Sequence, residues 1–372
     1  MSWRARQRAL VVAVLLLVLP FTAAPARSAT GGSSSFLVGV YYGNQGWAMD
    51  QVRALEAWQG RRNAVVNLFT NWDGSAKTKS NLFNQQLPNI WANGNVPLIT
   101  WEPFTAKNTP ADIERRIASG SYDTYVADWG ARLKRFLDGP DAVPGTADDR
   151  RAYLRLGHEM NGNWYPWGAA VGANSPADFI AMWRRVHAAF DAAGLGPSRL
   201  GWIWSVNHED VGGFKAEALF PGDDVVDWVA VDGYNWGASQ SWSSWRPPFE
   251  VFGDMVGRLR VISQRPLALT ETATSSTTAS GADLAAKSQW VTDLFGYAVT
   301  AEARMVVWLN DDKETDWAVF GGSGADGTFR YGRSTYRTLS AYKAGVNRPE
   351  AVSPASSDPR ILTDAQFTGV LP

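Results

Sequence analysis

The 372-residue chain has no cysteine and only three histidines. Without cysteine it can form no disulfide, so its fold must rely on a hydrophobic core, which a chain of this length readily supplies. The histidines, His158, His187 and His208, show no metal-ligand spacing. This argues against a metal-dependent hydrolase, and we expect no cofactor.

Neither sign of charge dominates the sequence. It has 35 basic and 36 acidic residues, and the formal net charge is −1. Residues 1–29 contain four arginines and no acidic residue, so the remaining chain carries a net charge of −5. Such a chain has no electrostatic reason to bind nucleic acid or anionic membranes.

An apolar run, Ala9 to Leu19, lies near the N-terminus and is too short for a good membrane span. Three arginines precede it, and small residues with possible cleavage sites at Ala24–Ala26 and Arg27–Ala29 follow. This pattern is typical of a secretory signal peptide, which we assign to residues 1–29, an uncleaved anchor being the alternative. We expect a secreted, extracellular and monomeric protein that has no membrane partner after cleavage.

Short β-rich runs alternate with helical stretches from Phe36 to about Lys343. The expected strands are Phe36–Tyr42, Ala64–Asn71, Val96–Trp101, Ala152–His158, Leu200–Val206, Val225–Tyr234, Pro266–Thr272 and Arg304–Asn310. The expected helices are Asp50–Gln59, Ser80–Asn93, Pro110–Ala118 with Asp123–Leu137, Pro176–Ala193, Phe249–Ile262, Leu284–Thr300 and a last one near Ser334–Lys343, with a short stretch at Gly213–Leu219. Eight strand–helix pairs in one series predict an α/β fold, a single-domain (β/α)8 TIM barrel over residues 30–343.

Two segments lie outside this alternation. Residues 344–372 are rich in proline and serine with little periodicity, and we interpret them as a docked or disordered C-terminal tail or a linker. Before the fourth strand, an acidic insertion carries four aspartates that could gather a Ca²⁺ ion: Asp138, Asp141, Asp148 and Asp149. Their spacing matches no EF-hand loop, and a solvated acidic turn is the alternative.

Aromatic residues are abundant, with 19 tryptophans and 11 tyrosines. Several fall in expected loops rather than strands: Trp164, Tyr165, Trp167, Trp236, Trp242 and Trp245. Flat rings gathered in loops are suited to stacking on sugar faces. They indicate a stacking surface.

Three glutamates stand at expected strand ends, where the active sites of such barrels lie. They are Glu102 on the third strand, Glu159 after the fourth and Glu271 on the seventh. Strands three and four are neighbours, whereas strands four and seven face each other across the ring. Retaining glycoside hydrolysis needs two carboxyl groups roughly 5–5.5 Å apart. The geometry therefore favours Glu159 with Glu271.

The string His158-Glu-Met-Asn-Gly162, followed by Trp164-Tyr-Pro-Trp167, resembles the acid/base motif of glycoside hydrolase family 26. Three further stretches agree in order: Trp204–Asn207, Asp232–Asn235 and Thr270–Thr272. The resemblance covers about residues 36–343. The family comprises mainly secreted endo-β-1,4-mannanases, with some β-1,3-1,4-glucanases and β-1,3-xylanases.

The resemblance implies a role for individual side chains. It makes Glu159 the general acid/base, Glu271 the nucleophile that forms a glycosyl-enzyme, and Tyr234 the hydroxyl that orients the nucleophile. It further implies support or substrate contact by His158, Trp164, Trp167, Asn207, Asp232 and Trp308. For His158, Tyr234 and Trp308 the alternative is plain packing, and for Trp101 and Glu102 substrate contact and packing are equally open.

We therefore expect a secreted retaining endo-β-glycanase that binds a β-linked polysaccharide and hydrolyses β-1,4-mannan. Mixed-linkage glucanase or β-1,3-xylanase activity within the same family is the alternative. A non-catalytic carbohydrate-binding barrel is the remote one, because it would lack at least one of the two carboxylates. The residues do not distinguish these sugars, nor endo from exo action.

Overall fold

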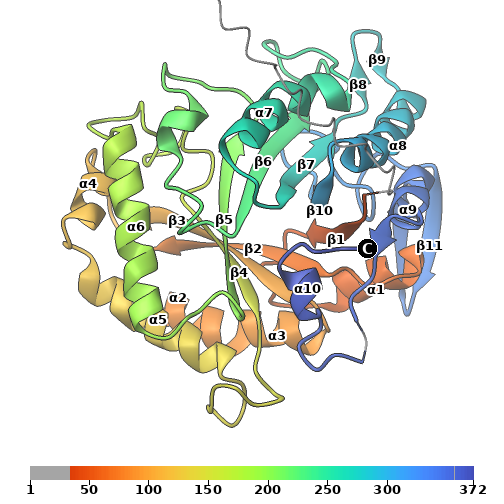
Figure 1. Ribbon diagram of the computed structural model, residues 1–372. Coiled ribbons are helices and arrows are strands. Elements are labelled where there is room, and N and C mark those ends of the chain that lie inside the picture. Colours follow the sequence, from red (N-terminus) through yellow and green to blue (C-terminus); the bar gives the residue numbers. More distant parts are fainter. Residues whose placement is uncertain (1–33, 356) are drawn as a thin grey trace, which may run out of the picture. The chain divides into compact units, whose positions relative to one another are not determined.

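The computed structural model describes residues 34–355 and 357–372, so the expected signal peptide lies outside the described residues. Within them, eight parallel strands close into a barrel because β1 pairs with both β2 and β10 (Figure 1). The strands are β1 (Phe36–Tyr41), β2 (Val65–Trp72), β3 (Val96–Thr105), β4 (Ala152–Leu156), β5 (Leu200–Asn207), β6 (Trp228–Asn235), β7 (Leu267–Thr274) and β10 (Ala303–Leu309). This confirms the predicted (β/α)8 barrel.

Helices surround the strands (Figure 1). They are α1 (Asp50–Gln59), α2 (Ala76–Asn81), η1 (Leu82–Gln86), α3 (Leu87–Ala92), α4 (Ile113–Ala118), α5 (Asp123–Leu137), α6 (Pro176–Ala192), η2 (Ala216–Leu219), α7 (Pro248–Ile262) and α8 (Leu284–Thr300). Local chemistry sets several ends. Ser175 caps α6 by accepting from the backbone N–H of Asp178, and Asp283 caps α8 in the same way through Ala286.

Two apolar clusters form the core. The larger one lies between strands and helices. The smaller one draws a residue from each of the eight barrel strands, which places it inside the barrel: Leu37, Val65, Leu98, Tyr153, Ile203, Ala230, Ala268 and Met305. Alternate residues of a strand share a face. On each strand, the residue two positions after the cluster residue therefore also points into the barrel, nearer the carboxyl end of the strand. Arg155, two residues after Tyr153, is one of them.

The expected last helix was partly wrong. Residues 334–338 form strand β12, which pairs antiparallel with β11 (Gly327–Tyr331), and helix α9 occupies only Ser340–Val346. The sequence Ser-Thr-Tyr-Arg-Thr of β12 is rich in β-favouring residues, and Gly332 at φ 57° supplies the turn.

The C-terminal tail is docked in the described structure. Strand β13 (Ala351–Val352) pairs with the start of β1, and helix α10 (Asp364–Phe367) follows. Leu362 and Phe367 join the interior cluster, and the Tyr153 hydroxyl donates to the Phe367 carbonyl at 2.9 Å. The tail thus closes the end of the barrel where the strands begin.

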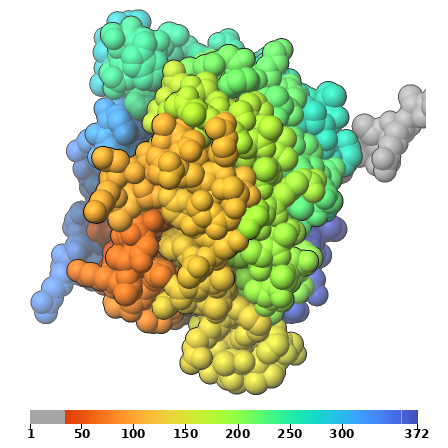
Figure 2. Space-filling model, turned by 90° about the vertical axis from the view of Figure 1, so that its left-hand side faces the viewer, coloured from red at the N-terminus to blue at the C-terminus, as the bar shows by residue number. Residues whose placement is uncertain are grey.

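The acidic insertion follows α5 and projects as a lobe below the face that α4, α5 and α6 cover (yellow in Figure 2). The Asp138 carboxylate forms ion pairs with Lys134 at 2.6 Å and Arg199 at 2.5 Å. Asp148 accepts from Thr146 and from the backbone of Asp141. Across residues 34–355 and 357–372, no cluster of acidic or histidine side chains could hold a metal ion. Basic side chains and turn hydrogen bonds thus engage the carboxylates of this insertion, as in the alternative interpretation of a solvated acidic turn.

The two hairpins outside the barrel are β11–β12 and the short β8 (Thr277–Thr278) with β9 (Gly281–Ala282). The second one closely follows β7, at the end of the barrel where the strands finish. Among the described helices, none combines the length and apolar character needed to cross a membrane.

Candidate active site

Glu159 stands just beyond β4, in a backbone turn that the sequence alone did not indicate. The strand ends at Leu156, and both Gly157 and Glu159 have φ 53°, in the left-handed region. A side chain at such a φ is strained by about 1 kcal/mol or more, so surrounding contacts must hold it there. The backbone N–H of Glu159 donates to the Ser205 carbonyl of β5 at 2.9 Å. This bond fixes the turn and aims the carboxyl inward.

Trp164 bonds the Glu159 carboxyl directly. Its indole Nε1 donates to Oε2 of Glu159 at 2.8 Å, and its ring is 46% exposed. Burial and the nearby charges of Asp232 and Glu271 raise the pKa of Glu159 well above its ordinary value. A carboxyl with a raised pKa stays protonated at pH values where ordinary glutamates are ionised, as a general acid must.

Glu271 lies within β7, on the opposite wall of the barrel. The Tyr234 hydroxyl donates to its Oε2 at 2.5 Å, and the Arg155 guanidinium contacts its Oε1. His158 Nε2 lies 3.8 Å from the same Oε1. Hydroxyl and guanidinium donors both stabilise the ionised form of a carboxylate. The structure thus holds the Glu271 carboxyl group in one orientation between a hydroxyl, a guanidinium and an imidazole.

Arg155 contacts the candidate site, although the sequence motifs did not single it out. Its Nη1 bonds both oxygens of Asp232 at 2.9 Å, and its Nε and Nη2 bond the Thr100 hydroxyl at 3.0 and 2.7 Å. The side chain is fully buried beneath the two glutamates. An arginine inside the apolar strand Ala152–Leu156 was a signal that could have revealed it, because a buried charge requires a partner.

Asp232 and His158 support the site from below. Asp232 also accepts from Ser205 at 2.8 Å and Thr270 at 2.7 Å, so four hydrogen bonds from three side chains hold a carboxyl group with no exposure. His158 is also fully buried, and burial together with Arg155 holds its pKa well below its ordinary value. A neutral imidazole beside Glu271 adds no charge to it.

Both glutamates line one cleft of about 760 Å³. Aromatic side chains form much of its wall: Trp164, Tyr165, Tyr234, Trp236, Trp242 and Trp317. Asn207, Lys313 and Glu314 are among its polar lining residues. An open cleft with stacking rings and scattered polar groups suits a neutral, hydroxyl-rich polymer.

Three tryptophans of the predicted site lie elsewhere. Trp101 has no exposure and stacks on Trp129 at 4.1 Å between ring centroids. Trp167 is equally buried behind Tyr165, and its Nε1 donates to the His158 carbonyl. Trp308 is buried and donates to the Trp317 carbonyl at 3.2 Å. All three are outside the cleft lining, and Trp317 lines the wall predicted for Trp308.

Glu102 is a third carboxyl near the pair. Glu102 lies on β3, where it pairs with Asn71 of β2, and its side chain is partly buried. Burial and the charge of Glu271 raise the pKa of Glu102 to about 7. Glu102 does not line the cleft. Its link to the site is the electrostatic effect of Glu271 on its pKa.

A (β/α)8 barrel whose fourth and seventh strands present two glutamates in an aromatic-lined cleft defines a protein of the glycoside hydrolase class. The model of glycosyl hydrolase family 26 matches residues 125–247, which include Glu159, Asp232 and Tyr234. Over these residues the chain is similar to this family.

Two curated relatives agree with the family. Endoglucanase H of Acetivibrio thermocellus is 27% identical over 356 residues, covering 94% of this chain and 33% of the relative. Mannan endo-1,4-beta-mannosidase A and B of Caldalkalibacillus mannanilyticus is 26% identical over 167 residues, covering 41% of this chain and 31% of the relative. The chain thus spans about a third of the length of each.

Solved structures share the fold. The catalytic domain of a GH26 endo-beta-1,4-mannanase from Bacillus sp. JAMB-750 has a TM-score of 0.59 at 18% identity, with 90% of each chain covered. A GH26 beta-mannanase from Bacteroides ovatus has a TM-score of 0.57 at 16% identity, covering 88% of this chain and 93% of that one.

Proposed function

We propose that the protein is a secreted, retaining endo-β-glycanase that hydrolyses β-1,4-mannosidic bonds in mannan-type polysaccharides. The observation that carries this proposal is the unequal pair in one cleft. Glu159 is buried with a raised pKa, and Glu271 is held by a guanidinium and a hydroxyl. Double displacement requires an acid that holds a proton and a second carboxyl group that is positioned to attack.

In the first step, a carboxylate oxygen of Glu271 attacks the anomeric carbon of the bound sugar. The bond to the leaving sugar breaks, and Glu159 transfers its proton to the departing oxygen. A glycosyl ester on Glu271 results, and Glu159 is left ionised.

In the second step, Glu159 takes a proton from a water molecule, whose oxygen attacks the same anomeric carbon. The ester bond to Glu271 breaks, and both glutamates return to their starting states. Two inversions at one carbon give net retention. Tyr234 and Arg155 keep Glu271 oriented in both steps.

A second substrate class deserves the same test, because the relative that aligns with 94% of this chain is named an endoglucanase. The substrate panel is therefore mannan, glucomannan, lichenan and β-1,3-xylan. Fastest hydrolysis of lichenan would replace mannan by mixed-linkage glucan as the substrate. No hydrolysis of any of the four would contradict the proposal.

The residue assignments are tested with Glu159→Ala and Glu271→Ala. Each should lower kcat/KM on the preferred polysaccharide about 10²–10⁴-fold, while Glu250→Ala, an exposed acid on α7, serves as the unchanged control. Azide should give a β-glycosyl azide with Glu159→Ala, because it replaces water in the second step, and an α-glycosyl azide with Glu271→Ala. Unchanged activity in either variant, or an inverted first product from the wild type, would contradict the mechanism.

A further inference from the structure

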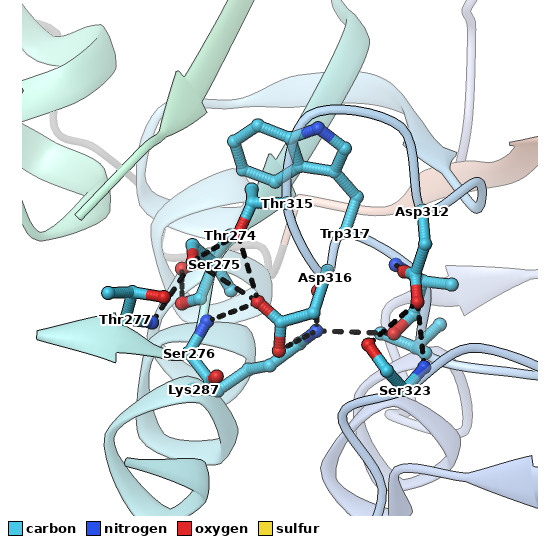
Figure 3. A network of polar contacts seen from close by, with 12 residues as sticks. Thr274, Ser275, Ser276, Thr277, Lys287, Asp312, Thr315, Asp316, Trp317 and Ser323 are labelled. Atoms are coloured by element: carbon cyan, nitrogen blue, oxygen red, sulfur yellow. Dashed lines mark hydrogen bonds and ion pairs between the residues drawn. The ribbon is translucent and has the colours of Figure 1, made fainter. Parts of the chain in front are cut away.

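Lys287 is a buried lysine for which the mechanism has no use. It lies in the first turns of α8, and its side chain has no exposure. Its Nζ donates to the carbonyl of Asp316 and, at 3.2 Å, to the carbonyl of Ala318 (Figure 3). These two carbonyls flank Trp317. One ammonium therefore holds the backbone on both sides of a residue that lines the cleft.

Asp316 completes the anchor with its side chain. Its Oδ2 lies 3.4 Å from Lys287 Nζ, and its Oδ1 accepts from the backbone N–H of Ser276 at 2.8 Å and the hydroxyl of Ser275 at 3.1 Å (Figure 3). Ser275 and Ser276 directly follow β7, the strand that carries Glu271. The loop after β10 is thus fastened to the end of the nucleophile's strand.

Trp317 transmits this anchor to the reacting groups. Its ring packs on Tyr234 with centroids 5.3 Å apart and on Trp236 at 4.8 Å. Tyr234 in turn bonds Glu271. A displaced Trp317 would therefore change both the wall of the cleft and the packing behind the hydroxyl that orients Glu271.

The far half of the same loop has its own support. Asp312 accepts from the backbone N–H groups of Ala318 at 2.8 Å and Ser323 at 2.7 Å. Loss of the Lys287 ammonium should therefore release the two carbonyls that flank Trp317, while Asp312 still holds the backbone at Ala318 and Ser323. This makes a local effect separable from general unfolding.

We propose that Lys287 is a positioning residue of the active site, whose ammonium fixes Trp317 and, through it, Tyr234 and Glu271. This inference rests on the proposed glycanase function. Lys287 lies on helix α8 outside the cleft, and it would affect catalysis through the residues that it holds in place.

The test compares Lys287→Met with Arg151→Met. Arg151 is a matched control, because it is equally buried and bonds a backbone carbonyl (Leu362) and an aspartate (Asp364), but at the opposite end of the barrel. The double variant Lys287→Met/Asp316→Asn removes the unpaired carboxylate and serves if the single variant does not fold. Kinetics are measured below the thermal transition of every variant.

We expect kcat on the preferred polysaccharide to fall about 10–100-fold in the Lys287 variants, the scale of a small misplacement of reacting groups. It should change less than twofold in Arg151→Met. A crystal structure of the Lys287 variant should show Trp317 displaced from Tyr234. An unmoved Trp317 together with kinetics matching Arg151→Met would overturn the proposal. If the wild type hydrolyses no glycan, the proposed function fails, and the crystal structure still decides the role of Lys287.

Discussion

Arg155 donates from Nη2 to Oε1 of Glu271, so a guanidinium on β4 directly contacts the carboxylate of β7. The same side chain binds both oxygens of Asp232 on β6. One cation thus ties together three strands beneath the cleft. The guanidinium lies between Asp232 and Glu271 and offsets the repulsion between these two buried carboxyl groups.

Replacing Arg155 should therefore damage stability and activity together. Arg155→Met leaves Asp232 and Glu271 without their shared cation, and removal of one partner from a buried ion pair costs about 3–5 kcal/mol. Urea denaturation at pH 7 measures this loss, and kcat should fall because Glu271 loses one of the two donors that orient it. Arg155→Lys keeps the positive charge but not the fork of donors. Its stability and kcat should therefore lie between those of the wild type and those of Arg155→Met. A stable, active Arg155→Met would refute this account.

The pH profile should depend on Glu159. Because its pKa is raised, the wild type keeps the acid protonated well above pH 4.5, and kcat/KM should fall as pH rises through that higher pKa. With an aryl glycoside that has a good leaving group, Glu159→Ala should lose this alkaline limb, since no proton needs to be donated. A profile with the same alkaline limb in the variant would assign the limb to another group.

Glu114 offers a stability prediction away from the cleft. It is fully buried on α4, and burial raises its pKa to about 9. The folded state therefore holds a proton that the unfolded chain releases near pH 4.5. The free energy of unfolding should decrease as pH rises from about 4.5 to 9.

Glu114→Gln removes that ionisation. At pH 8 it should be more stable than the wild type, by up to about 1.4 kcal/mol for each pH unit above 4.5, and at pH 4.5 the difference should nearly vanish. Urea denaturation at both pH values gives the comparison. An equal difference at the two values would mean that Glu114 does not titrate in this range.

Trp242 should affect substrate binding rather than chemistry. It is 70% exposed and lines the cleft, with its ring against Trp236 at 5.2 Å. Loss of one stacking ring costs about 0.5–1.5 kcal/mol, so Trp242→Ala should raise KM for the polysaccharide several-fold and leave kcat nearly unchanged. Phe249 is also 70% exposed but lies outside the cleft lining, and Phe249→Ala is the matched control. Equal KM values in both variants would exclude Trp242 from the binding surface.

The barrel could be predicted because each strand is a short apolar run between clear helical stretches. Helices α1 and α8 even begin and end at the predicted residues. The end of β4 was placed two residues too late, because the turn at Gly157 and Glu159 uses left-handed backbone that an apolar run does not announce. The β11–β12 hairpin was missed because residues 334–338, which form its second strand, were interpreted as part of the following helix.

The meeting of Glu159 and Glu271 in one cleft could likewise be expected, since both lie at carboxyl ends of strands in a closed barrel. The aromatic wall was harder to predict. Trp308 and Trp317 are both close to the end of β10, and only the loop path determines which one faces the cleft. The position of Arg155 inside an apolar strand indicates a buried ion pair, but the sequence does not show which carboxylates the guanidinium meets.

The left-handed backbone of Glu159 sets stability and activity against each other at one position. Glycine adopts φ 53° without strain and brings no carboxyl to bury, so Glu159→Gly should give a sturdier protein that has lost its acid. Selection for thermal stability alone would therefore favour Glu159→Gly. A library screened for robustness must therefore hold position 159 constant, or the most durable clones will be inactive ones.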